Sequence, residues 1–278
     1  MAKHPAEVFG CSFKEASNLP KKGRKKYWCP FVDDKCNKQS RPIKYPMGVC
    51  SVQYGDNIVA LCPRRFLQDN TVFKDIADHY FQTRNDLVVF SEIGLSQTGT
   101  FDYVMVKHKP FSSEIEDFVV IEFQTGQTTG TGQLVKGFKD CLAGENIEGK
   151  SYGFGLNLAD IWKRSFTQIL NKGIVLENWG HKIYWVVQEP VYQDFLNRYN
   201  LKGMTYNEGH TTVFSIYDLS SNAGKCNLFQ TRIESSTVDD LFKAFRNNPN
   251  IPSRGDFLKK LKTKLNAKME LKLKLSKI

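Results

Sequence analysis

Two apolar segments joined by a short polar loop constrain the fold of this chain more than any other feature. They are FDYVMVKH at residues 101–108 and DFVVIEFQ at residues 117–124, and KPFSSEIE separates them. Their β-branched and aromatic residues predict two strands, and the short connection predicts that they pair as an antiparallel hairpin.

Polar side chains gather at one end of this hairpin. Glu122 and Gln124 share a face of their strand because side chains alternate along a strand. If the hairpin is centred between residues 112 and 113, Asp102 lies opposite Phe123, and a bulge or a small register shift would bring it onto the face of that pair. The residues directly before Glu122 are apolar, so a carboxylate there is costly to bury unless a cation or hydrogen bonds satisfy it.

Two carboxylates and an amide oxygen are hard donors, which suit Mg²⁺. Hydrolysis of a phosphodiester needs such a cation to activate water and to neutralise charge on the phosphate. Glu92 ends the expected preceding strand, NDLVVFSE, and could be a further acidic member of the site. On this pattern alone, carboxylates that cap loops or form ion pairs are the commoner explanation.

Cysteines cluster near the start of the sequence, where five of the seven fall within the first 62 residues. Thiolates close in sequence can close a tetrahedral site for Zn²⁺ or a single iron. The spacings match no CxxC knuckle, so scattered buried cysteines are the alternative. The candidate ligands are Cys29, Cys36, Cys50 and Cys62, with Cys11 as a substitute, whereas Cys141 and Cys226 are expected to be buried small hydrophobes.

The remaining pattern predicts a mixed α/β (α+β) fold. Helices are expected at 71–82, from about 157 to Gly180, at 191–199 and at 237–247, and strands at 85–92, 182–189, 211–219 and 226–233. Residues 1–66 show little periodicity and predict a loop-dominated segment without its own core. We expect residues 1–68 to be a metal-binding segment packed on a catalytic domain at 69–278.

The charge balance favours a polyanionic partner. Lys plus Arg number 39 against 29 Asp plus Glu, a net charge of +10, although a merely basic protein is an equal alternative. Candidate phosphate contacts are KKGRKK at 21–26, Arg64 and Arg65, although solvated surface residues are at least an equal alternative for each. Lys163 and Arg164 fall off the apolar stripe of their helix and are candidates to face DNA. The lysine-rich tail, with Leu258, Leu261, Leu265 and Met269 on one face, is expected to be a helix that packs on the body of the protein. The alternative is that this helix contacts phosphates or a membrane surface.

No apolar span or signal core is visible in the sequence, so we expect a cytoplasmic location.

Several motifs together resemble the NotI restriction endonuclease family. They are the order AEVFG, CPF, GVC and ALCPRRF near the start, then SEIGLSQTG, FDYV and VIEFQT, then WKRSFTQIL and GHKIYWVVQEPVYQDFL. The likeness runs from about residue 6 to about residue 200, and the last third matches only in general layout.

The resemblance implies a PD-(D/E)XK nuclease core with a mixed central sheet flanked by helices, in which glutamine at Gln124 replaces the usual lysine. It implies Mg²⁺ bound by Asp102 and Glu122, Glu92 as an accessory acid, and one structural iron on the four cysteines, where zinc is the alternative. The segment between Glu92 and Asp102 is shorter than the family pattern. The resemblance further implies a bacterial homodimer that cuts palindromic double-stranded DNA to leave 5′-phosphate and 3′-hydroxyl ends, together with a cognate methyltransferase.

Glutamine carries no charge, so Gln124 can only orient the attacking water or lend its oxygen to a metal. Two other classes of function remain open from the sequence. A non-enzymatic, metal-stabilised DNA-binding protein would retard DNA without cutting it, and a nonspecific or repair nuclease would give a smear or a structure-dependent nick rather than discrete fragments.

Overall fold

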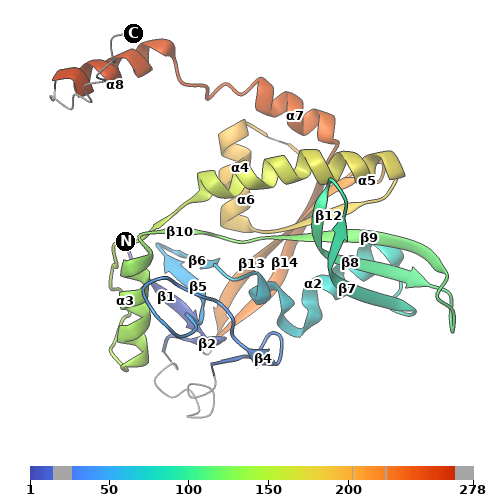
Figure 1. Cartoon of the computed structure of the whole chain (residues 1–278), viewed down its shortest axis with the longest axis horizontal. Coiled ribbons are helices and arrows are strands. Elements are labelled where there is room, and N and C mark those ends of the chain that lie inside the picture. Colours follow the sequence, from blue (N-terminus) through green and yellow to red (C-terminus); the bar gives the residue numbers. More distant parts are fainter. Residues whose placement is uncertain (15–26, 202, 223, 267–278) are drawn as a thin grey trace, which may run out of the picture.

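A six-stranded sheet forms the centre of the structure, a computed structural model that describes residues 1–14, 27–201, 203–222 and 224–266. The strand order is β14-β13-β12-β9-β8-β7 (Figure 1). The bounds are β7 (Leu87–Leu95), β8 (Gly99–His108), β9 (Ile115–Gln124), β12 (Ile183–Gln188), β13 (Thr212–Asn222) and β14 (Lys225–Ser236). Strand β12 runs parallel to β9 and β13, and the other pairs are antiparallel. The predicted mixed α/β class is therefore confirmed.

Helices cover both faces of this sheet. On one face lies a continuous helical stretch of α4 (Leu158–Gln168), η4 (Ile169–Gly173) and α5 (Ile174–Trp179), which ends at Gly180 in the left-handed conformation. Its apolar stripe is buried against the sheet by Ile161, Trp162 and Ile169. On the other face lie α2 (Thr71–Ile76) and η3 (Ala77–Phe81), with Val72 and Ile76 buried. Both helical stretches agree with the sequence prediction.

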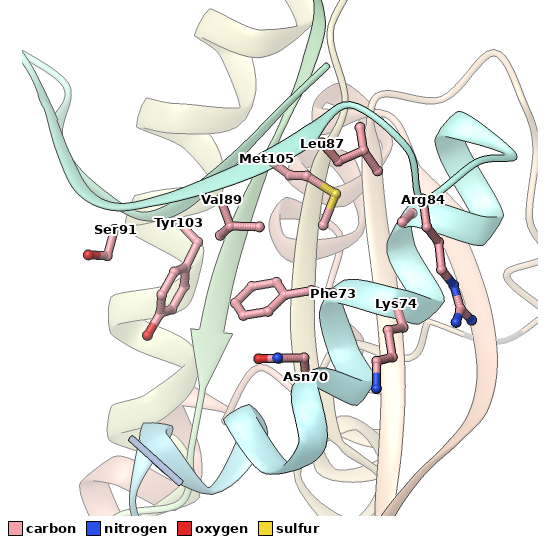
Figure 2. Close-up of a pocket in the computed structure, with 10 residues that line it drawn as sticks. Asn70, Phe73, Lys74, Arg84, Leu87, Val89, Ser91, Tyr103 and Met105 are labelled. Carbon is pink, nitrogen blue, oxygen red and sulfur yellow. The ribbon is translucent and has the colours of Figure 1, made fainter. Parts of the chain in front are cut away.

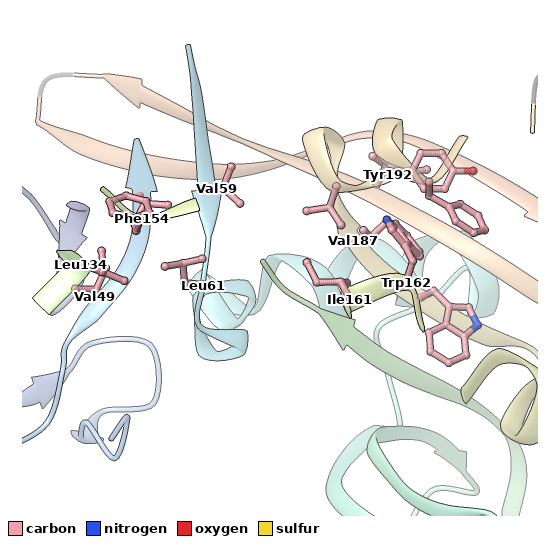
Figure 3. Close-up of a cluster of buried hydrophobic side chains, with 14 of the residues drawn as sticks. Val49, Val59, Leu61, Leu134, Phe154, Ile161, Trp162, Val187 and Tyr192 are labelled. Atoms are coloured by element: carbon pink, nitrogen blue, oxygen red, sulfur yellow. The ribbon is translucent and has the colours of Figure 1, made fainter. Parts of the chain in front are cut away.

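The N-terminal segment forms a sheet that shares the core of the main sheet, so the expectation of a loop-dominated segment is wrong. It forms a four-stranded sheet in the order β2-β1-β5-β6. Its strands are β1 (Lys3–Val8), β2 (Cys11–Ser12), β5 (Val49–Tyr54) and β6 (Asn57–Ala60). Figure 3 shows Val49 and Val59 of this sheet in one buried cluster with Ile161 and Trp162 of α4. The expected division at residue 68 stays a prediction.

Helix α3 (Thr131–Leu142) packs on β1 and has no counterpart among the predicted elements. Its Gly137 lies where a Cβ atom would meet Pro5 Cδ at 3.0 Å, so glycine allows the helix to approach the strand closely. The remaining short elements are β3 (Trp28–Cys29), β4 (Asp34–Lys35), η2 (Pro63–Asn70), β10 (Thr128–Thr129) and β11 (Gly155–Leu156).

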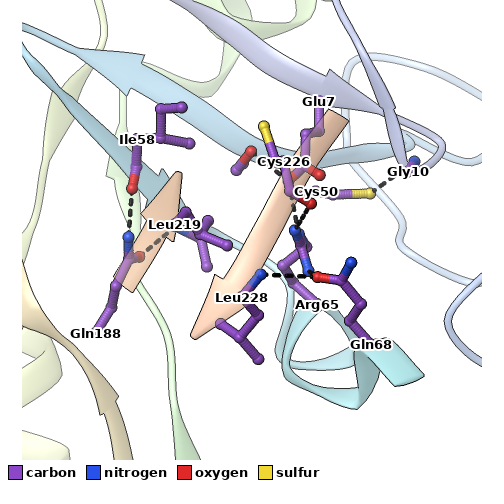
Figure 4. Close-up of polar contacts among 12 residues, drawn as sticks. Glu7, Gly10, Cys50, Ile58, Arg65, Gln68, Gln188, Leu219, Cys226 and Leu228 are labelled. Carbon is purple, nitrogen blue, oxygen red and sulfur yellow. Dashed lines mark hydrogen bonds and ion pairs between the residues drawn. The ribbon is translucent and has the colours of Figure 1, made fainter. Parts of the chain in front are cut away.

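A buried arginine joins the N-terminal sheet to the end of the main sheet. Arg65 is fully buried and its Nε donates to Glu7 Oε2 at 2.7 Å. Its Nη2 donates to the carbonyl oxygen of Cys226 on β14 at 2.6 Å, and its Nη1 to Gln68 Oε1 at 2.8 Å (Figure 4). Because each nitrogen of this guanidinium is hydrogen-bonded inside the protein, Arg65 is neither the candidate phosphate contact nor a solvated surface residue, and both alternatives are wrong.

The C-terminal part contains α6 (Glu189–Tyr199), α7 (Val238–Arg246) and α8 (Arg254–Asn266). Residues 254–265 of α8 are all exposed, and the helix stands apart from the body in Figure 1. The expected packing of this helix on the body is therefore wrong, and Met269 lies outside the described residues. Nowhere in the described ranges is a helix both long and apolar enough to cross a membrane.

Candidate active site

The hairpin of β8 and β9 brings Asp102 and Glu122 to the same level. The ladder pairs Lys107 with Asp117 and Tyr103 with Ile121, after a register shift between Lys107 and His108. Continuing this register by one residue sets Asp102 opposite Glu122, not opposite Phe123 as the loop-centred estimate predicted. The register shift anticipated from the sequence is therefore present, and it puts both carboxylates on one face of the sheet.

Hydrogen bonds link the two carboxylates directly to the facing strands. The backbone N–H of Asp102 donates to Glu122 Oε1 at 3.3 Å, and the backbone N–H of Phe123 donates to Asp102 Oδ2 at 2.9 Å. Glu122 is fully buried, whereas Asp102 is half-buried. Within the described part of the chain, the buried oxygen Oε2 of Glu122 has no hydrogen-bond partner.

Burial changes the protonation of both acids. It raises the pKa of Glu122 to about 7; the negative charge of Asp102 adds to the rise, and hydrogen bonding to Lys172 opposes it. Burial also raises the pKa of Asp102, while the hydrogen bond from the Phe123 backbone lowers it. Two like charges in a desolvated place are unfavourable, so the arrangement favours a bound cation.

Glu92 lies inside β7 and not at its end, which corrects the expected strand boundary. The pairs Ser91–Tyr103 and Ile93–Phe101 flank it, so Glu92 lies level with Asp102 on the neighbouring strand. It is exposed and has φ 56°, a left-handed conformation that is uncommon for a residue with a side chain. Its negative charge contributes to the raised pKa of Asp102, after the larger effect of burial. Three acidic residues thus lie level on three adjacent strands.

The amide of Gln124 is fixed at both ends by α4. Ser165 Oγ donates to Gln124 Oε1 at 2.7 Å, and Gln124 Nε2 donates to Gln168 Oε1 at 3.1 Å. Each end of an amide can make one more hydrogen bond. Gln124 is therefore oriented, with one acceptor and one donor position remaining.

Lys172 is a residue of this site that the sequence analysis missed. It belongs to η4, and its Nζ donates to Glu122 Oε1 at 2.7 Å and to the carbonyl oxygen of Thr100 at 2.6 Å. A signal is present in the sequence: Ser165, Gln168 and Lys172 follow the i, i+3, i+7 spacing of one helix face. That spacing does not reveal which strand the face meets.

The four candidate cysteine ligands lie near one another in the N-terminal segment. Burial raises the pKa of Cys36, and the charges of Cys62 and Cys29 add to the rise. The pKa of Cys50 is well above its usual value, mainly through burial, and the charge of Cys62 contributes. Across residues 1–14, 27–201, 203–222 and 224–266, however, no group of three or more His, Cys, Asp or Glu side chains is placed to hold a metal ion.

A backbone N–H group and a lysine ammonium lie beside these four cysteines. The backbone N–H of Gly10 donates to Cys50 Sγ at 3.3 Å, and the Lys38 ammonium donates to the carbonyl oxygens of Val49 and Leu61. Burial lowers the pKa of Lys38, and the charges of nearby thiols oppose this. Cys141 and Cys226 are buried, as predicted.

The other candidate phosphate contacts differ in where they lie. Lys163 and Arg164 are exposed on α4, off its apolar stripe, as predicted. Burial raises the pKa of Tyr103 and the charge of Arg64 opposes the rise, so Arg64 lies within electrostatic range of the residue next to Asp102. The run at 21–26 lies outside the described residues.

An open hollow of about 570 Å³ lies on the opposite face of the β7–β8 hairpin. Figure 2 shows Phe73 from α2 facing Val89 of β7 and Tyr103 and Met105 of β8, with Lys74 and Arg84 also lining the hollow. Tyr103 alternates with Asp102 along β8 and therefore points away from the carboxylates. This hollow is separate from the acidic site.

The mixed sheet flanked by helices is consistent with a nuclease fold, and comparison with known proteins identifies the class. The family model for restriction endonuclease NotI matches residues 7–228, most of the chain and beyond the part where the motifs are similar. The chain belongs to the NotI restriction endonuclease family and is a type II site-specific deoxyribonuclease. A comparison with curated protein sequences gives no match.

Proposed function

We propose that this enzyme uses Mg²⁺ to hydrolyse phosphodiester bonds in palindromic double-stranded DNA, on a nuclease core of the PD-(D/E)XK type. Its products would carry 5′-phosphate and 3′-hydroxyl ends. Asp102, Glu122, Gln124 and Glu92 would form the active site. The observation that carries the proposal is Glu122 Oε2, a buried oxygen with no hydrogen-bond partner in the described chain, beside a second carboxylate.

The residues present fit a magnesium ion. A buried carboxylate oxygen without a hydrogen bond is costly, and a hard cation is the ligand that would satisfy it. Glu122 would bind through Oε2, because Oε1 is occupied by Lys172 and the Asp102 backbone. Asp102 has one carboxylate oxygen occupied by the Phe123 backbone and would bind through the other. When bound, Mg²⁺ would supply the positive charge that activates water and stabilises the leaving 3′ oxygen.

The remaining residues would position the reactants. Gln124 Oε1 keeps one acceptor position beside its bond from Ser165, and there it would accept a hydrogen bond from the attacking water and so orient it. Glu92 is exposed and level with Asp102, where it could bind a second cation or a water. Its exposed position makes it the accessory acid and not the central one.

The four cysteines Cys29, Cys36, Cys50 and Cys62 would hold one structural iron or zinc. Their four sulfur donors suit either metal. The hydrogen bond from Gly10 to Cys50 Sγ and the half-buried Lys38 ammonium would offset the negative charge of thiolates. Metal analysis of the purified protein should find about one iron or zinc per chain, and Cys36→Ala should lose it and unfold more easily. Wild-type protein without either metal would refute this part.

The proposed palindromic substrate implies two partners, a second copy of this chain and a methyltransferase. A palindromic site has a two-fold axis, so a homodimer would present one active site to each strand. A cognate methyltransferase would protect the same sequence in the bacterial cytoplasm. Light scattering of the purified enzyme should give twice the chain mass, and a monomer with normal cleavage of both strands would contradict the dimer.

Digestion of plasmid and phage DNA tests the main proposal. Wild-type enzyme with Mg²⁺ should give discrete fragments, and sequencing their ends should show one palindromic site. Glu122→Ala and Asp102→Ala should abolish cutting and still bind DNA. Fragments from Glu122→Ala at the wild-type rate would overturn the site, and a smear from the wild type would instead favour a nonspecific nuclease.

A further inference from the structure

One positive charge lies inside the acidic site. Lys172 is about 4% exposed, and it sits on η4, across from the ends of the β8–β9 ladder. Among the described residues, no other lysine or arginine forms an ion pair with Glu122, and none forms one with Asp102 or Glu92. The ammonium is thus the single cation that this part of the chain supplies to the carboxylates.

Lys172 also joins the two strands where their backbone pairing stops. The last paired residues of the β8–β9 ladder on this side are Tyr103 and Ile121. Beyond them, Lys172 Nζ bridges the carbonyl oxygen of Thr100 on β8 and Glu122 Oε1 on β9, at 2.6 and 2.7 Å. The spacing of the two acid-bearing strand ends therefore depends on this side chain.

The same contact selects which oxygen of Glu122 is available. Oε1 accepts from Lys172 and from the Asp102 backbone, so the rotation of the carboxylate is fixed and Oε2 alone is left without a hydrogen bond in the described chain. A buried charge-assisted hydrogen bond is strong enough to hold such a rotamer. Gln124, on the same face of β9, carries no charge and cannot replace the ammonium.

We propose that Lys172 is a positioning residue for DNA cleavage: it supplies from a helix the positive charge that position 124 lacks, and it holds Glu122 so that only Oε2 is free. This inference rests on the proposed function of Asp102 and Glu122. Lys172 does not itself touch the scissile phosphate, and it acts on the reaction through Glu122. Its loss should therefore slow the chemical step more than it weakens DNA binding.

The test compares Lys172→Met with a double variant that moves the charge, Gln124→Lys/Lys172→Met. Cleavage of a duplex carrying the recognition site is measured at saturating Mg²⁺ with the full chain. Lys172→Met should lower kcat about 100-fold or more, as loss of a group that acts electrostatically at a reaction centre does, and change KM for DNA less than about 3-fold. The double variant should regain at least about 10-fold of kcat. Lys139→Met, an exposed lysine on α3, should match the wild type.

A purely structural ion pair gives a different pattern. It would lower the denaturant midpoint, leave kcat per folded molecule near the wild-type value, and gain nothing from a lysine at position 124. Either wild-type kcat in folded Lys172→Met or no recovery in the double variant overturns the proposal. If Lys172→Met does not fold, Lys172→Gln, which keeps a donor and removes the charge, takes its place in both comparisons.

Glu122→Ala, measured in parallel, distinguishes failure of the proposed active site from failure of the proposed role of Lys172. If Glu122→Ala cuts DNA at the wild-type rate, the proposed active site fails. If Glu122→Ala is inactive while folded Lys172→Met is normal, only the role of Lys172 fails.

Discussion

At neutral pH, the surroundings of Glu122 oppose the release of its carboxyl proton. Burial raises its pKa to about 7, with the charge of Asp102 adding to the rise and Lys172 opposing it. In the folded protein without metal, the group therefore holds its proton over a pH range in which an exposed glutamate is ionised. Mg²⁺ must compete with that proton for Glu122.

Cleavage at limiting Mg²⁺ should therefore depend steeply on pH. We expect the rate to rise about tenfold per unit below pH 7 and to level off above it, because the carboxylate form binds the metal. Rates at constant ionic strength between pH 5.5 and 8.5 check this. A flat profile over that range would contradict the role of Glu122 as a ligand.

The same shift predicts the opposite trend for the stability of the metal-free protein. The native state binds the proton more tightly than the unfolded chain, whose glutamate titrates near 4.5. The contribution of this group to the free energy of unfolding should thus be fully present below about pH 4.5 and lost as the pH rises through about 7. Denaturant unfolding in EDTA measures it, and Glu122→Gln should remove this part of the pH dependence.

At the scale of elements, the arginine that joins the two sheets is the clearest stabilising contact. Arg65 and Glu7 form an ion pair whose side chains are 0% and 1% exposed. Arg65→Met should lower the free energy of unfolding by about 3–5 kcal/mol, because it leaves a buried carboxylate without its partner. Arg84→Met is a matched control, since the Arg84–Asp78 pair is exposed to solvent and its loss should change the free energy of unfolding far less. If urea unfolding shows the same loss of stability for Arg65→Met and Arg84→Met, the stabilising role of the buried ion pair is contradicted.

Long periodic elements could be predicted from the sequence, and short ones could not. The apolar stripe of α4 and the alternation in β8 and β9 are local, so they identify the elements and the pair Glu122 and Gln124 directly. The N-terminal strands are short and lie among Gly, Pro and Lys, and their buried residues belong to a core that they share with distant parts of the chain. Helix α3 contains Gly132 and Gly137, which lower helix propensity, and tertiary packing overrides that preference.

The same difference between local and distant contacts decides which residues of the candidate site could be predicted from the sequence. Asp102 and Glu122 come from one hairpin, so the register of two neighbouring strands nearly suffices to place them. Lys172 lies 50 residues beyond Glu122 and reaches it only after the helix crosses the sheet. A buried lysine on a helix has no local signal that tells which carboxylate it will meet.

For the whole molecule, α8 contributes little to folding. All residues from 254 to 265 are exposed, including Phe257 and Leu265. A chain ending at Pro252 should keep its free energy of unfolding within about 0.5 kcal/mol of the full chain, because residues 254–265 of α8 are exposed. A chain ending at Ser236 is the control: it also loses α7, which buries Val238 and Leu241, and should be destabilised. Equal losses in both truncations would show that α8 packs on the body.

The contact between Arg65 and Cys226 also sets an order of events during synthesis. The two residues are separated by 161 positions, and Leu228 donates to Gln68 across a similar distance. At roughly 5–20 residues per second, the ribosome needs roughly 8–32 s between Arg65 and Cys226. The strands that carry the acidic residues leave the ribosome within that interval, while the arginine still lacks its last partner. A newly made nuclease therefore completes its fold only after nearly all of its sheet has been translated, which delays its first encounter with DNA as an active enzyme.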